Sequence, residues 1–438
     1  MRKISSDLYL PLGVKDLTRL VNQEVTIKGV IHNIREVGKL RFIIVRLGGS
    51  LVQCILETNK TDISPEIYRE GNYVALSGTV VCESKAAHGF EIRIETMEVV
   101  SQPAEPMPFA VNKKKLAVSL PINLDHRPIA LRHQKQAAIF RIQAAIALLF
   151  RQALQQAGFT EIFSPKIVFA GAEGGANVFA LDYFGRKVYL AQSPQFYKQM
   201  MVGVFGRVFE VGPVFRAEPH DTARHLNEYV SMDLEMGPIA GFEDIMQTET
   251  YVLAEIFRGL VALCPEELSL LEVTVPQITE IPVITMAEAL AIAGETHQCR
   301  ECGDLDSESE KLVCQRVTEQ TGSELVFVTH YPTLTRPVYA MEDPFDPNLT
   351  LSFDLLFRGL EITTGGQRIH EYEAQVEKMK RFGLDPAKYE EYLMIHRFGM
   401  PPHGGLGLGL ERLTAQLLGL GSVKEASLFP RTMTRVTP

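Results

Sequence analysis

Charged residues flank glycine-rich segments at two places in the second half of the chain. In the first, Glu361 precedes and Arg368 follows two adjacent glycines, and in the second a run of alternating glycines from Gly404 ends at Arg412. Glycine lets a ligand approach the backbone closely, and arginine binds carboxylates and phosphates bidentately. The pattern therefore predicts a site for a ligand with one carboxylate and several phosphates. Two glycine turns with surface arginines would produce the same pattern and remain the alternative.

Two further segments place polar side chains together. A helix is expected to begin at Ser193-Pro194, a favourable helix start, and it places Gln195 and Lys198 on one face. The strand expected from 229 to 236 places Asp233 on the same face as Tyr229, Ser231 and Glu235. A tyrosine with carboxylates inside a sheet is unusual for a plain core, so this strand is expected to contribute to a site.

A cluster of potential metal ligands is less specific. His297, Cys299, Cys302 and Cys314 lie close together, but they include only one C-x-x-C pair. Structural zinc sites usually combine two such pairs or their histidine equivalents. Free thiols in a surface insertion are therefore the favoured interpretation, with zinc as the alternative.

The composition indicates a multidomain globular protein. A chain of 438 residues exceeds one ordinary core, and its 46% hydrophobic and 22% charged residues are typical of globular proteins. A net charge of −9 argues against a protein that coats nucleic acid non-specifically. Neither a membrane span nor the apolar core of a signal peptide is evident, so we expect a cytoplasmic protein without a membrane partner.

The hydrophobic patterns predict an α+β protein: an N-terminal OB-fold β-barrel and a C-terminal antiparallel sheet flanked by helices. The barrel strands are expected at 25–34, 40–47, 51–56, 73–81 and 90–99. The expected domains are 1–105, a hinge at 106–130 and a second domain at 131–438, with a less regular insertion at about 264–335. In the second domain, helices are expected at 137–157, 374–382, 386–398 and 411–419, and strands at 159–168, 207–218, 229–236, 336–341 and 351–356.

The barrel carries side chains suited to nucleic acid. Phe42 and Gln53 lie on neighbouring expected strands and Glu91 on the last one. An aromatic ring can stack on a base, while amide and carboxylate groups can read base edges. A core phenylalanine with a solvated polar pair is the alternative.

In sequence order, three segments resemble the motifs of class II aminoacyl-tRNA synthetases. The segment 159–168 with Pro165 resembles motif 1, 215–225 with the following strand resembles motif 2, and 405–412 resembles motif 3. The segments 192–199 and 365–368 are similar to those of aspartyl-tRNA synthetases of the archaeal and eukaryotic type. The resemblance covers nearly the whole chain and implies a homodimer that activates L-aspartate with ATP and transfers it to tRNA(Asp).

The resemblance implies roles on the ATP side. Arg216 would bind the α-phosphate and the attacking carboxylate, and Arg412 the γ-phosphate. His225 would lie near the outer phosphates, Glu218 near the adenine amino group, and Tyr229 against the adenine ring. Glu361 and Thr364 match the positions that bind Mg²⁺, an ion that prefers oxygen ligands.

The resemblance also implies an aspartate pocket. Lys198 and Arg368 would bind the side-chain carboxylate, while Asp233 and Gln195 would accept hydrogen bonds from the α-ammonium group. Glu173 matches a residue of a mobile lid that closes over the amino acid. Relatives often have serine just before this glutamate, where this chain has alanine, so one ammonium contact is expected to be missing.

In the barrel, Phe42, Gln53 and Glu91 match anticodon-binding residues of the family. His32 stands where relatives restricted to tRNA(Asp) typically have tryptophan, which leads to the hypothesis that tRNA(Asn) is also charged. An asparaginyl-tRNA synthetase of the same architecture is one alternative, although its side-chain pocket should not need the Lys198 and Arg368 pair. An OB-fold RNA-binding protein with an inactive synthetase domain is another.

Overall fold

The computed structural model describes residues 13–59, 63–169, 177–294 and 303–438. The chain forms two compact units, residues 1–137 and 138–438. The expected hinge at 106–130 falls within the first unit. The possible zinc ligands His297, Cys299 and Cys302 and the residue Glu173 of the predicted lid lie outside the described residues. The remaining member of the possible zinc set, Cys314, is buried among apolar side chains.

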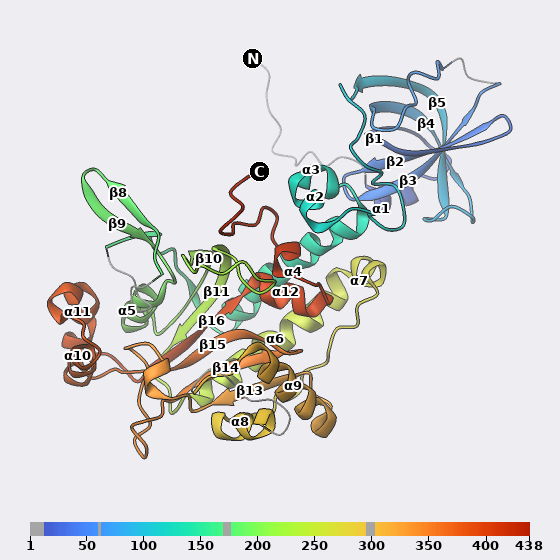
Figure 1. The fold of residues 1–438 in the computed structure, drawn as a ribbon. Helices are drawn as coiled ribbons and strands as arrows, with labels where there is room; N and C mark the ends of the chain where they lie inside the picture. Colours follow the sequence, from blue (N-terminus) through green and yellow to red (C-terminus); the bar gives the residue numbers. More distant parts are fainter. Residues whose placement is uncertain (1–12, 60–62, 170–176, 295–302) are drawn as a thin grey trace. The chain divides into compact units, whose positions relative to one another are not determined.

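The first unit contains the expected five-stranded barrel. Its strands are β1 (Glu24–Val37), β2 (Leu40–Leu47), β3 (Ser50–Glu57), β4 (Tyr73–Cys82) and β5 (Phe90–Ser101), preceded by α1 (Val14–Arg19) and followed by α2 (Leu120–Asp125) and α3 (Arg127–Ala130) (Figure 1). They close in the order β1-β2-β3-β5-β4. Inward-facing residues such as Ile43, Val45, Val52 and Cys54 are fully buried. The alternation of these strands therefore predicted the barrel correctly.

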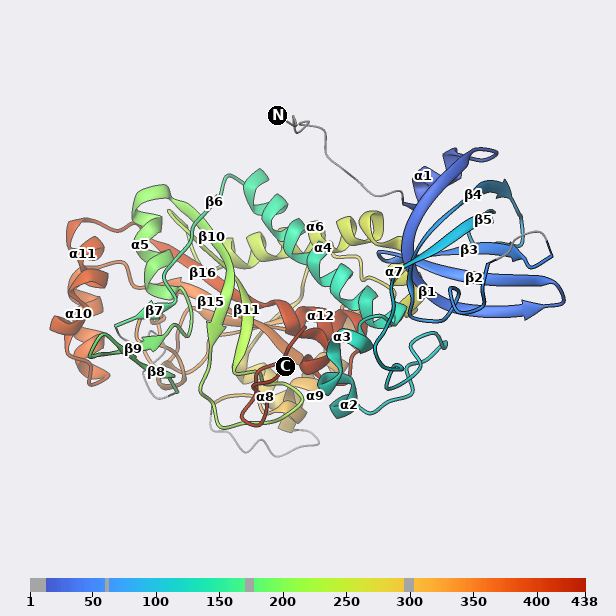
Figure 2. The ribbon, with the colours of Figure 1, turned by 90° about the horizontal axis from the view of Figure 1, so that it is seen from above.

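The second unit is built on an eight-stranded sheet in the order β12-β13-β14-β15-β16-β11-β10-β6. Figure 2 shows β15, β16, β11, β10 and β6 of this sheet. Its strands are β6 (Thr160–Glu161), β10 (Arg207–Phe215), β11 (Glu228–Met236), β12 (Val283–Thr285), β13 (Leu325–Thr329), β14 (Ser352–Phe357), β15 (Leu360–Arg368) and β16 (His403–Gly409). All neighbours are antiparallel except the outermost pairs, β12–β13 and β6–β10, which are parallel. This arrangement confirms the predicted fold class.

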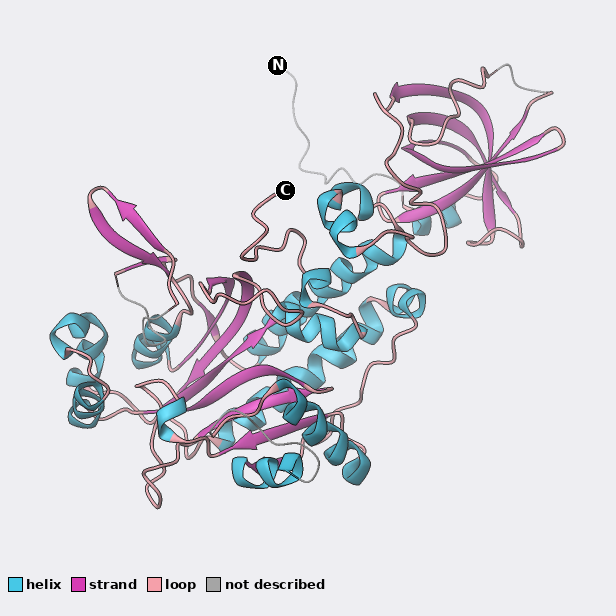
Figure 3. Ribbon diagram, viewed as in Figure 1, coloured by secondary structure: helices cyan, strands magenta, loops and turns pink. Residues whose placement is uncertain are grey.

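Helices cover the sheet unequally (Figure 3). One core joins α4 (Gln134–Gln156), α6 (Glu243–Leu263) and α12 (Leu410–Leu418) to apolar strand residues such as Met232 and Leu234. Ser231 and Asp233, which alternate with them along β11, line a cavity on the opposite face. Helix α4 is long and apolar enough to cross a membrane, but its buried residues, Ile142 and Phe150 among them, pack in this core. Its hydrophobicity is thus explained by the fold.

Two expected strands differ from the structure. The segment 159–168 contains only the short strands β6 and β7 (Ile167–Val168), because Pro165 lies between them and proline cannot donate a backbone hydrogen bond to a sheet. Strand β7 joins β8 (Ala180–Tyr183) and β9 (Arg186–Leu190) in a separate sheet. The expected strand at 336–341 is also wrong: the segment follows the short helix η1 (Thr333–Thr335) and makes only a single bridge, from Ala340 to Arg368.

The segment 264–335 is more regular than expected. It contains α7 (Pro265–Leu271), α8 (Met286–Gly294) and α9 (Ser307–Thr321), and it supplies the sheet strands β12 and β13. The remaining elements are α5 (Gln195–Phe205), α10 (Tyr372–Arg381), η2 (Pro386–Tyr389), α11 (Glu390–Phe398) and η3 (Val423–Ala426). Helices α8 and α9 pack on β13 through a second core that includes Val326 and Val328. Because α9 reaches the cavity face, the segment contributes to the candidate site.

One buried carboxyl group in this fold makes stability depend on pH. Glu249 on α6 is 2% exposed, and burial raises its pKa from 4.5 to about 8. The unfolded chain loses this proton near pH 4.5 while the folded protein keeps it, so stability falls as the pH rises between these values. We expect Glu249→Gln to flatten this dependence and to raise the free energy of unfolding at pH 8 by roughly 1–3 kcal/mol. Urea unfolding at several pH values measures both effects.

The exposed Glu319 on α9 provides the control. Glu319→Gln should leave the pH dependence of unfolding as in the wild type. An unchanged pH slope in Glu249→Gln would contradict the assignment of a protonated carboxyl group at this position.

Candidate active site

A cavity of about 420 Å³ lies on the face of the main sheet opposite α4 and α6. Every described residue predicted to bind ATP, aspartate or magnesium lines it: Gln195, Lys198, Arg216, Glu218, His225, Tyr229, Asp233, Glu361, Thr364, Arg368 and Arg412. Arg224 and Arg336 add further positive charge, and Glu411 adds a carboxyl group. Since six of the lining residues are arginine or lysine and four are carboxylic acids, the cavity suits an anionic ligand.

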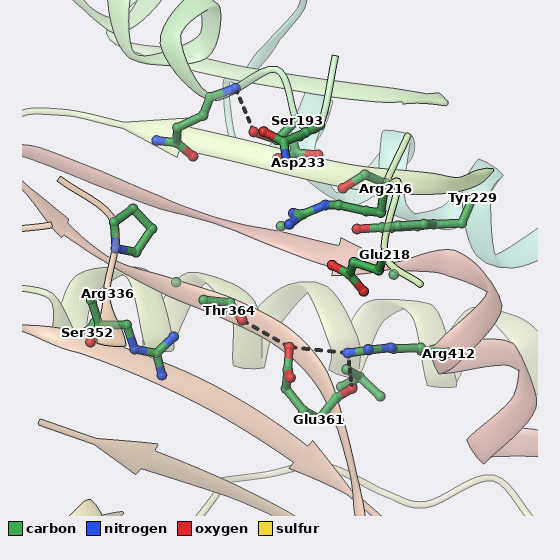
Figure 4. Close-up of a pocket in the computed structure, with 18 of the residues that line it drawn as sticks. Ser193, Arg216, Glu218, Tyr229, Asp233, Arg336, Ser352, Glu361, Thr364 and Arg412 are labelled. Carbon is green, nitrogen blue, oxygen red and sulfur yellow. Dashed lines mark hydrogen bonds and ion pairs between the residues drawn. The ribbon is translucent and has the colours of Figure 1, made fainter. Parts of the chain in front are cut away.

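One side of the cavity holds an arginine, a carboxylate and a hydroxyl group. Arg412, in the first turn of α12, donates a hydrogen bond to the backbone oxygen of Glu361 at 3.0 Å, and the same nitrogen lies 3.2 Å from Glu361 Oε1. The Thr364 hydroxyl donates to Glu361 Oε1 at 3.0 Å. Figure 4 shows these three side chains joined on this side. Strand β15 and helix α12 thus position an ion pair whose outer atoms face the cavity.

The charge states in this group are set by its partners. Burial alone would raise the pKa of Glu361, but Arg412 and the Thr364 hydroxyl hold it below its usual value. Burial would likewise lower the pKa of Arg412, but Glu361 and Tyr229 raise it. Glu361 is therefore an anionic oxygen donor at neutral pH, and Arg412 is a cation.

The facing side is formed by the connection between β10 and β11. Figure 4 shows Arg216, Glu218 and Tyr229 gathered there, with their side chains directed toward the space above Glu361. Asn227 braces the connection, because its side chain donates to the backbone oxygens of Arg216 at 2.6 Å and Glu218 at 3.1 Å. The backbone of Arg216 in turn donates to Asn227 O at 2.9 Å. These bonds fix the base of the loop from which Arg216 and Glu218 project.

The same loop is tied to α9. Arg224 donates to both carboxylate oxygens of Glu310, at 2.7 and 2.6 Å. Burial raises the pKa of Glu310 to about 7, against the opposing effect of Arg224. Burial and the nearby Arg412 also lower the pKa of His225, whose Nδ1 lies 2.7 Å from the Thr222 hydroxyl. His225 is thus a neutral hydrogen-bonding group at pH 7. The contribution of Glu310 was missed because its segment was expected to be irregular.

A compact ion network lies at the end of the cavity formed by α5 and β15. Lys198 contacts Asp233 Oδ1 at 2.9 Å and Glu235 Oε2 at 3.3 Å, and Arg368 Nε donates to Glu235 Oε1 at 2.9 Å. All four side chains are at most 6% exposed. Asp233 Oδ2 is buried and has no hydrogen-bond partner among the described residues. The network therefore combines two cations near the cavity with a buried acceptor suited to a ligand's ammonium group.

The glycines serve packing as well as access. A Cβ atom at Gly365 would lie 2.4 Å from the Phe353 ring, and one at Gly405 would lie 2.2 Å from Glu235 Oε2. Arg368 also donates to Gly405 O at 2.8 Å. The glycine pattern was predicted to admit a ligand, whereas at Gly405 it admits the Glu235 carboxylate that pairs with Arg368.

Two residues that line the cavity, Arg336 and Tyr339, were missed. Arg336 binds Asp354 through two hydrogen bonds of 3.0 and 2.7 Å, and its guanidinium group stacks 3.6 Å from the Tyr331 ring centre. Tyr339 lines the cavity with its ring 5.2 Å from the Arg368 guanidinium group. The signal that was misinterpreted is the segment 336–341, which was taken for a strand. Pro337 within it cannot donate a backbone hydrogen bond to a neighbouring strand, which favours a loop.

Phe42, Gln53 and Glu91 lie on the neighbouring strands β2, β3 and β5, and of the three only Glu91 is buried, at 4% exposed. Phe42 is partly exposed and carries the Arg35 guanidinium group 5.0 Å from its ring centre. Gln53 donates to Glu91 Oε2 at 3.0 Å. His32 is the bulged residue of β1, because Ile31 and Asn33 pair with the consecutive residues Val45 and Ile44. The structure thus joins Gln53 to Glu91 and places His32 at a bulge.

Comparison with known proteins identifies relatives along the whole chain. An Aspartate--tRNA(Asp/Asn) ligase from Thermus thermophilus is 44% identical over 97% of this chain and 99% of the relative. An Aspartate--tRNA(Asp) ligase from Pyrococcus abyssi is 36% identical over 97% and 98%, respectively. Among solved structures, asparaginyl-tRNA synthetase from Pyrococcus horikoshii matches with a TM-score of 0.90 and 29% identity, covering 98% of this chain and 100% of that one.

An aspartyl-tRNA synthetase from Entamoeba histolytica matches with a TM-score of 0.83 and 28% identity, covering 100% of this chain and 96% of that one. The family model described as tRNA synthetases class II (D, K and N) matches residues 119–433. That region contains the cavity and all of its lining residues. The chain is therefore a member of the class II tRNA synthetases (D, K and N), a family of aminoacyl-tRNA ligases.

Proposed function

We propose that this protein activates L-aspartate with ATP to form aspartyl-adenylate and transfers the aspartyl group to tRNA. The observation that carries the proposal is the meeting of two sets of residues in one cavity. Arg216 and Arg412 suit a triphosphate and Glu361 suits its Mg²⁺, while Lys198 and Arg368 suit a second carboxylate. The full-length relatives named as aspartate–tRNA ligases support the same function.

The first step needs positioning and charge neutralisation more than an acid or a base. The α-carboxylate of aspartate attacks the α-phosphorus of ATP, a P–O bond forms, and pyrophosphate leaves. Arg216 would neutralise the charge that develops on the α-phosphate, and Arg412 would hold the far end of the triphosphate. Tyr229 would stack on the adenine ring, while Glu218 would accept a hydrogen bond from its amino group. These residues line the cavity from facing sides, which supports a folded ATP between them (Figure 4).

The residues present also fit a magnesium ion. Glu361 is held as a carboxylate, and the Thr364 hydroxyl lies beside it, so two hard oxygen ligands face the cavity. When bound, Mg²⁺ would neutralise phosphate charge. These two residues would hold the ion.

The amino acid would bind between α5 and β15. Its side-chain carboxylate would contact Lys198 and Arg368, and its ammonium group would meet the unsatisfied Asp233 Oδ2 and the Gln195 side chain. Asparagine lacks the negative charge and would leave the two cations less well neutralised. Glu173, in the segment similar to a lid, is proposed as a further contact.

An asparaginyl-tRNA synthetase activity is the alternative to the proposed aspartate activity. The solved asparaginyl-tRNA synthetase shares the fold, so the fold alone does not separate the two activities. The relatives with 36–44% identity are named as aspartate–tRNA ligases, which supports aspartate. ATP–pyrophosphate exchange with aspartate and with asparagine tests the proposal. Exchange that depends on asparagine alone would overturn it.

An RNA-binding protein with an inactive synthetase domain is disfavoured. A chain that had lost catalysis would not need to retain Arg216, Glu361 and Arg412, and all three line the cavity. The barrel, which carries Phe42, Gln53 and Glu91 on neighbouring strands, is proposed as the anticodon-binding part of the same enzyme. We also propose a cytoplasmic location and a homodimer. Phe163 within motif 1 and Phe169 next to it are 84% and 73% exposed, which supports dimerisation.

His32 is proposed to relax the choice of tRNA. Its side chain is half-buried beside Arg46 and His133, and burial, Arg46 and His133 lower its pKa, so it is neutral at pH 7. A bulge re-aims the side chain of a strand, and a larger ring at this point would narrow the space for a base. We expect His32→Trp to reduce the charging of tRNA(Asn) at least roughly 10-fold relative to tRNA(Asp), the effect of one lost base contact. Aminoacylation of both tRNA transcripts measures the ratio.

Pyrophosphate exchange without tRNA is the internal control, because His32 lies in the barrel and not in the cavity. If the wild type charges only tRNA(Asp), the relaxed-choice proposal is wrong while the aspartate–tRNA ligase proposal stands.

A further inference from the structure

A series of buried hydrogen bonds runs from His403 on β16 to the amino-acid end of the cavity. His403 Nδ1 lies 2.9 Å from Pro401 O, and His403 Nε2 lies 3.0 Å from Gln199 Nε2. Gln199 Oε1 in turn lies 3.1 Å from Gln195 Nε2. His403 and Gln199 are fully buried and Gln195 is 3% exposed. Of these three residues only Gln195, the last in the series, lines the cavity.

The direction of each bond in this series is fixed by its first member. A backbone carbonyl can only accept, so His403 Nδ1 must carry the proton. In a neutral imidazole the other nitrogen is then an acceptor, so Gln199 must present its NH₂ group to it. The oxygen of Gln199 therefore faces Gln195, and Gln195 must donate. Its own oxygen is left to face the cavity.

We propose that His403 and Gln199 are positioning residues that hold the Gln195 side chain with its oxygen toward the amino group of the substrate. The inference rests on the proposed aspartate subsite and deepens it. An ammonium group needs acceptors, and an inverted Gln195 would present donors to it instead. These hydrogen bonds from His403 through Gln199 to Gln195, here called the relay, thus select one of the two orientations of the Gln195 amide. The two orientations are otherwise nearly equal in shape.

The surroundings keep His403 neutral, as the relay requires. Burial foremost lowers its pKa to about 4, and Arg368 on β15 and His396 on α11 act in the same direction. Glu235 on β11 opposes them. At physiological pH the ring is therefore an acceptor at Nε2. A protonated ring would donate at both nitrogens. The Gln199 amide would then have to turn its oxygen toward His403, and the Gln195 amide would turn in response.

A double-mutant cycle separates this role from a general packing role. Gln199→Met removes the partner that orients Gln195, and we expect it to raise the KM for aspartate in pyrophosphate exchange by about 5- to 20-fold. The KM for ATP and the kcat should change less than about twofold, because uniform binding of one substrate is affected. In a Gln195→Glu background both side-chain oxygens are acceptors and no orientation can be lost. There, Gln199→Met should raise the KM for aspartate less than about twofold.

Gln375→Met is the matched control. Gln375 is as buried as Gln199 and also contacts Tyr392, but its amide donates to Val338 O and not to a cavity residue. It should change stability without changing the KM for aspartate. An equal rise in both backgrounds, or the same rise in Gln375→Met, would overturn the proposal. Absence of aspartate-dependent exchange in the wild type would instead refute the proposed function.

A measurement on the wild type covers the case in which Gln199→Met does not fold. The ¹⁵N chemical shifts of the His403 ring should show a proton on Nδ1 and a bare Nε2 at pH 7. A proton on Nε2 would overturn the relay whatever the kinetics show.

Discussion

Arg412→Ala should lower kcat/KM for aspartate-dependent pyrophosphate exchange by roughly 10³-fold or more, the effect of removing a preorganised charge from a transition state. Arg412 lies in the first turn of α12 and is held by the backbone oxygen and the carboxylate of Glu361. The Arg412 side chain would therefore already be oriented when a triphosphate binds, and it would need little reorganisation during the reaction. Arg412→Lys should recover only part of the loss, because lysine does not reproduce the planar fork.

The pH dependence of the residual activity gives a second measurement. Among the partners of Glu361, Arg412 contributes most to holding its pKa below the usual value. Without Arg412 the carboxylate should take up a proton at a higher pH. The acidic limb of the pH–rate profile should therefore move to higher pH in Arg412→Ala and less in Arg412→Lys. Near-normal exchange in Arg412→Ala would remove this residue from the proposed mechanism.

Regular elements with strong local patterns were predictable from the sequence. The barrel strands alternate because each has one buried face, and α4 shows apolar residues at helical spacing because it lies on the sheet. The strand β11 was predicted with its polar face, and that face does line the cavity at Tyr229, Ser231 and Asp233. In such elements the pattern of buried and exposed positions can be seen in the local sequence itself.

Features that depend on distant partners were not predictable in this way. The segment 336–341 was taken for a strand because it is apolar, but its single bridge to Arg368 is set by tertiary contacts. The pairing of Arg224 with Glu310 joins residues 86 positions apart. Lys198 and Arg368, the two cations of the aspartate pocket, were expected to pair with the substrate carboxylate. In the structure Glu235 already lies between them, a contact that depends on the space left by Gly405.

Arg368→Ala should raise the free-energy barrier for aspartate activation by about 2–5 kcal/mol, the range for removing one member of a buried charged contact. Two losses contribute to this increase in the barrier. The substrate loses a bidentate partner, and the fully buried Glu235 keeps Lys198 as its one ion-pair partner among the described residues. Lys198 is then held more strongly by Glu235 and is less available to a ligand. The measurement is kcat/KM for aspartate in pyrophosphate exchange, with the KM for ATP followed in parallel.

Arg358→Ala separates the loss of the pocket from a loss of stability. Arg358 also makes paired contacts with a glutamate, Glu324, at 3.0 Å, and with the backbone oxygens of residues 416 and 417, but it does not line the cavity. It should lower the free energy of unfolding and leave kcat/KM for aspartate within about twofold of the wild type. Arg368→Ala should instead affect aspartate far more than ATP. If both variants weakened aspartate and ATP equally, Arg368 would be a structural residue, and the choice of a dicarboxylic amino acid would have to rest on Lys198 alone.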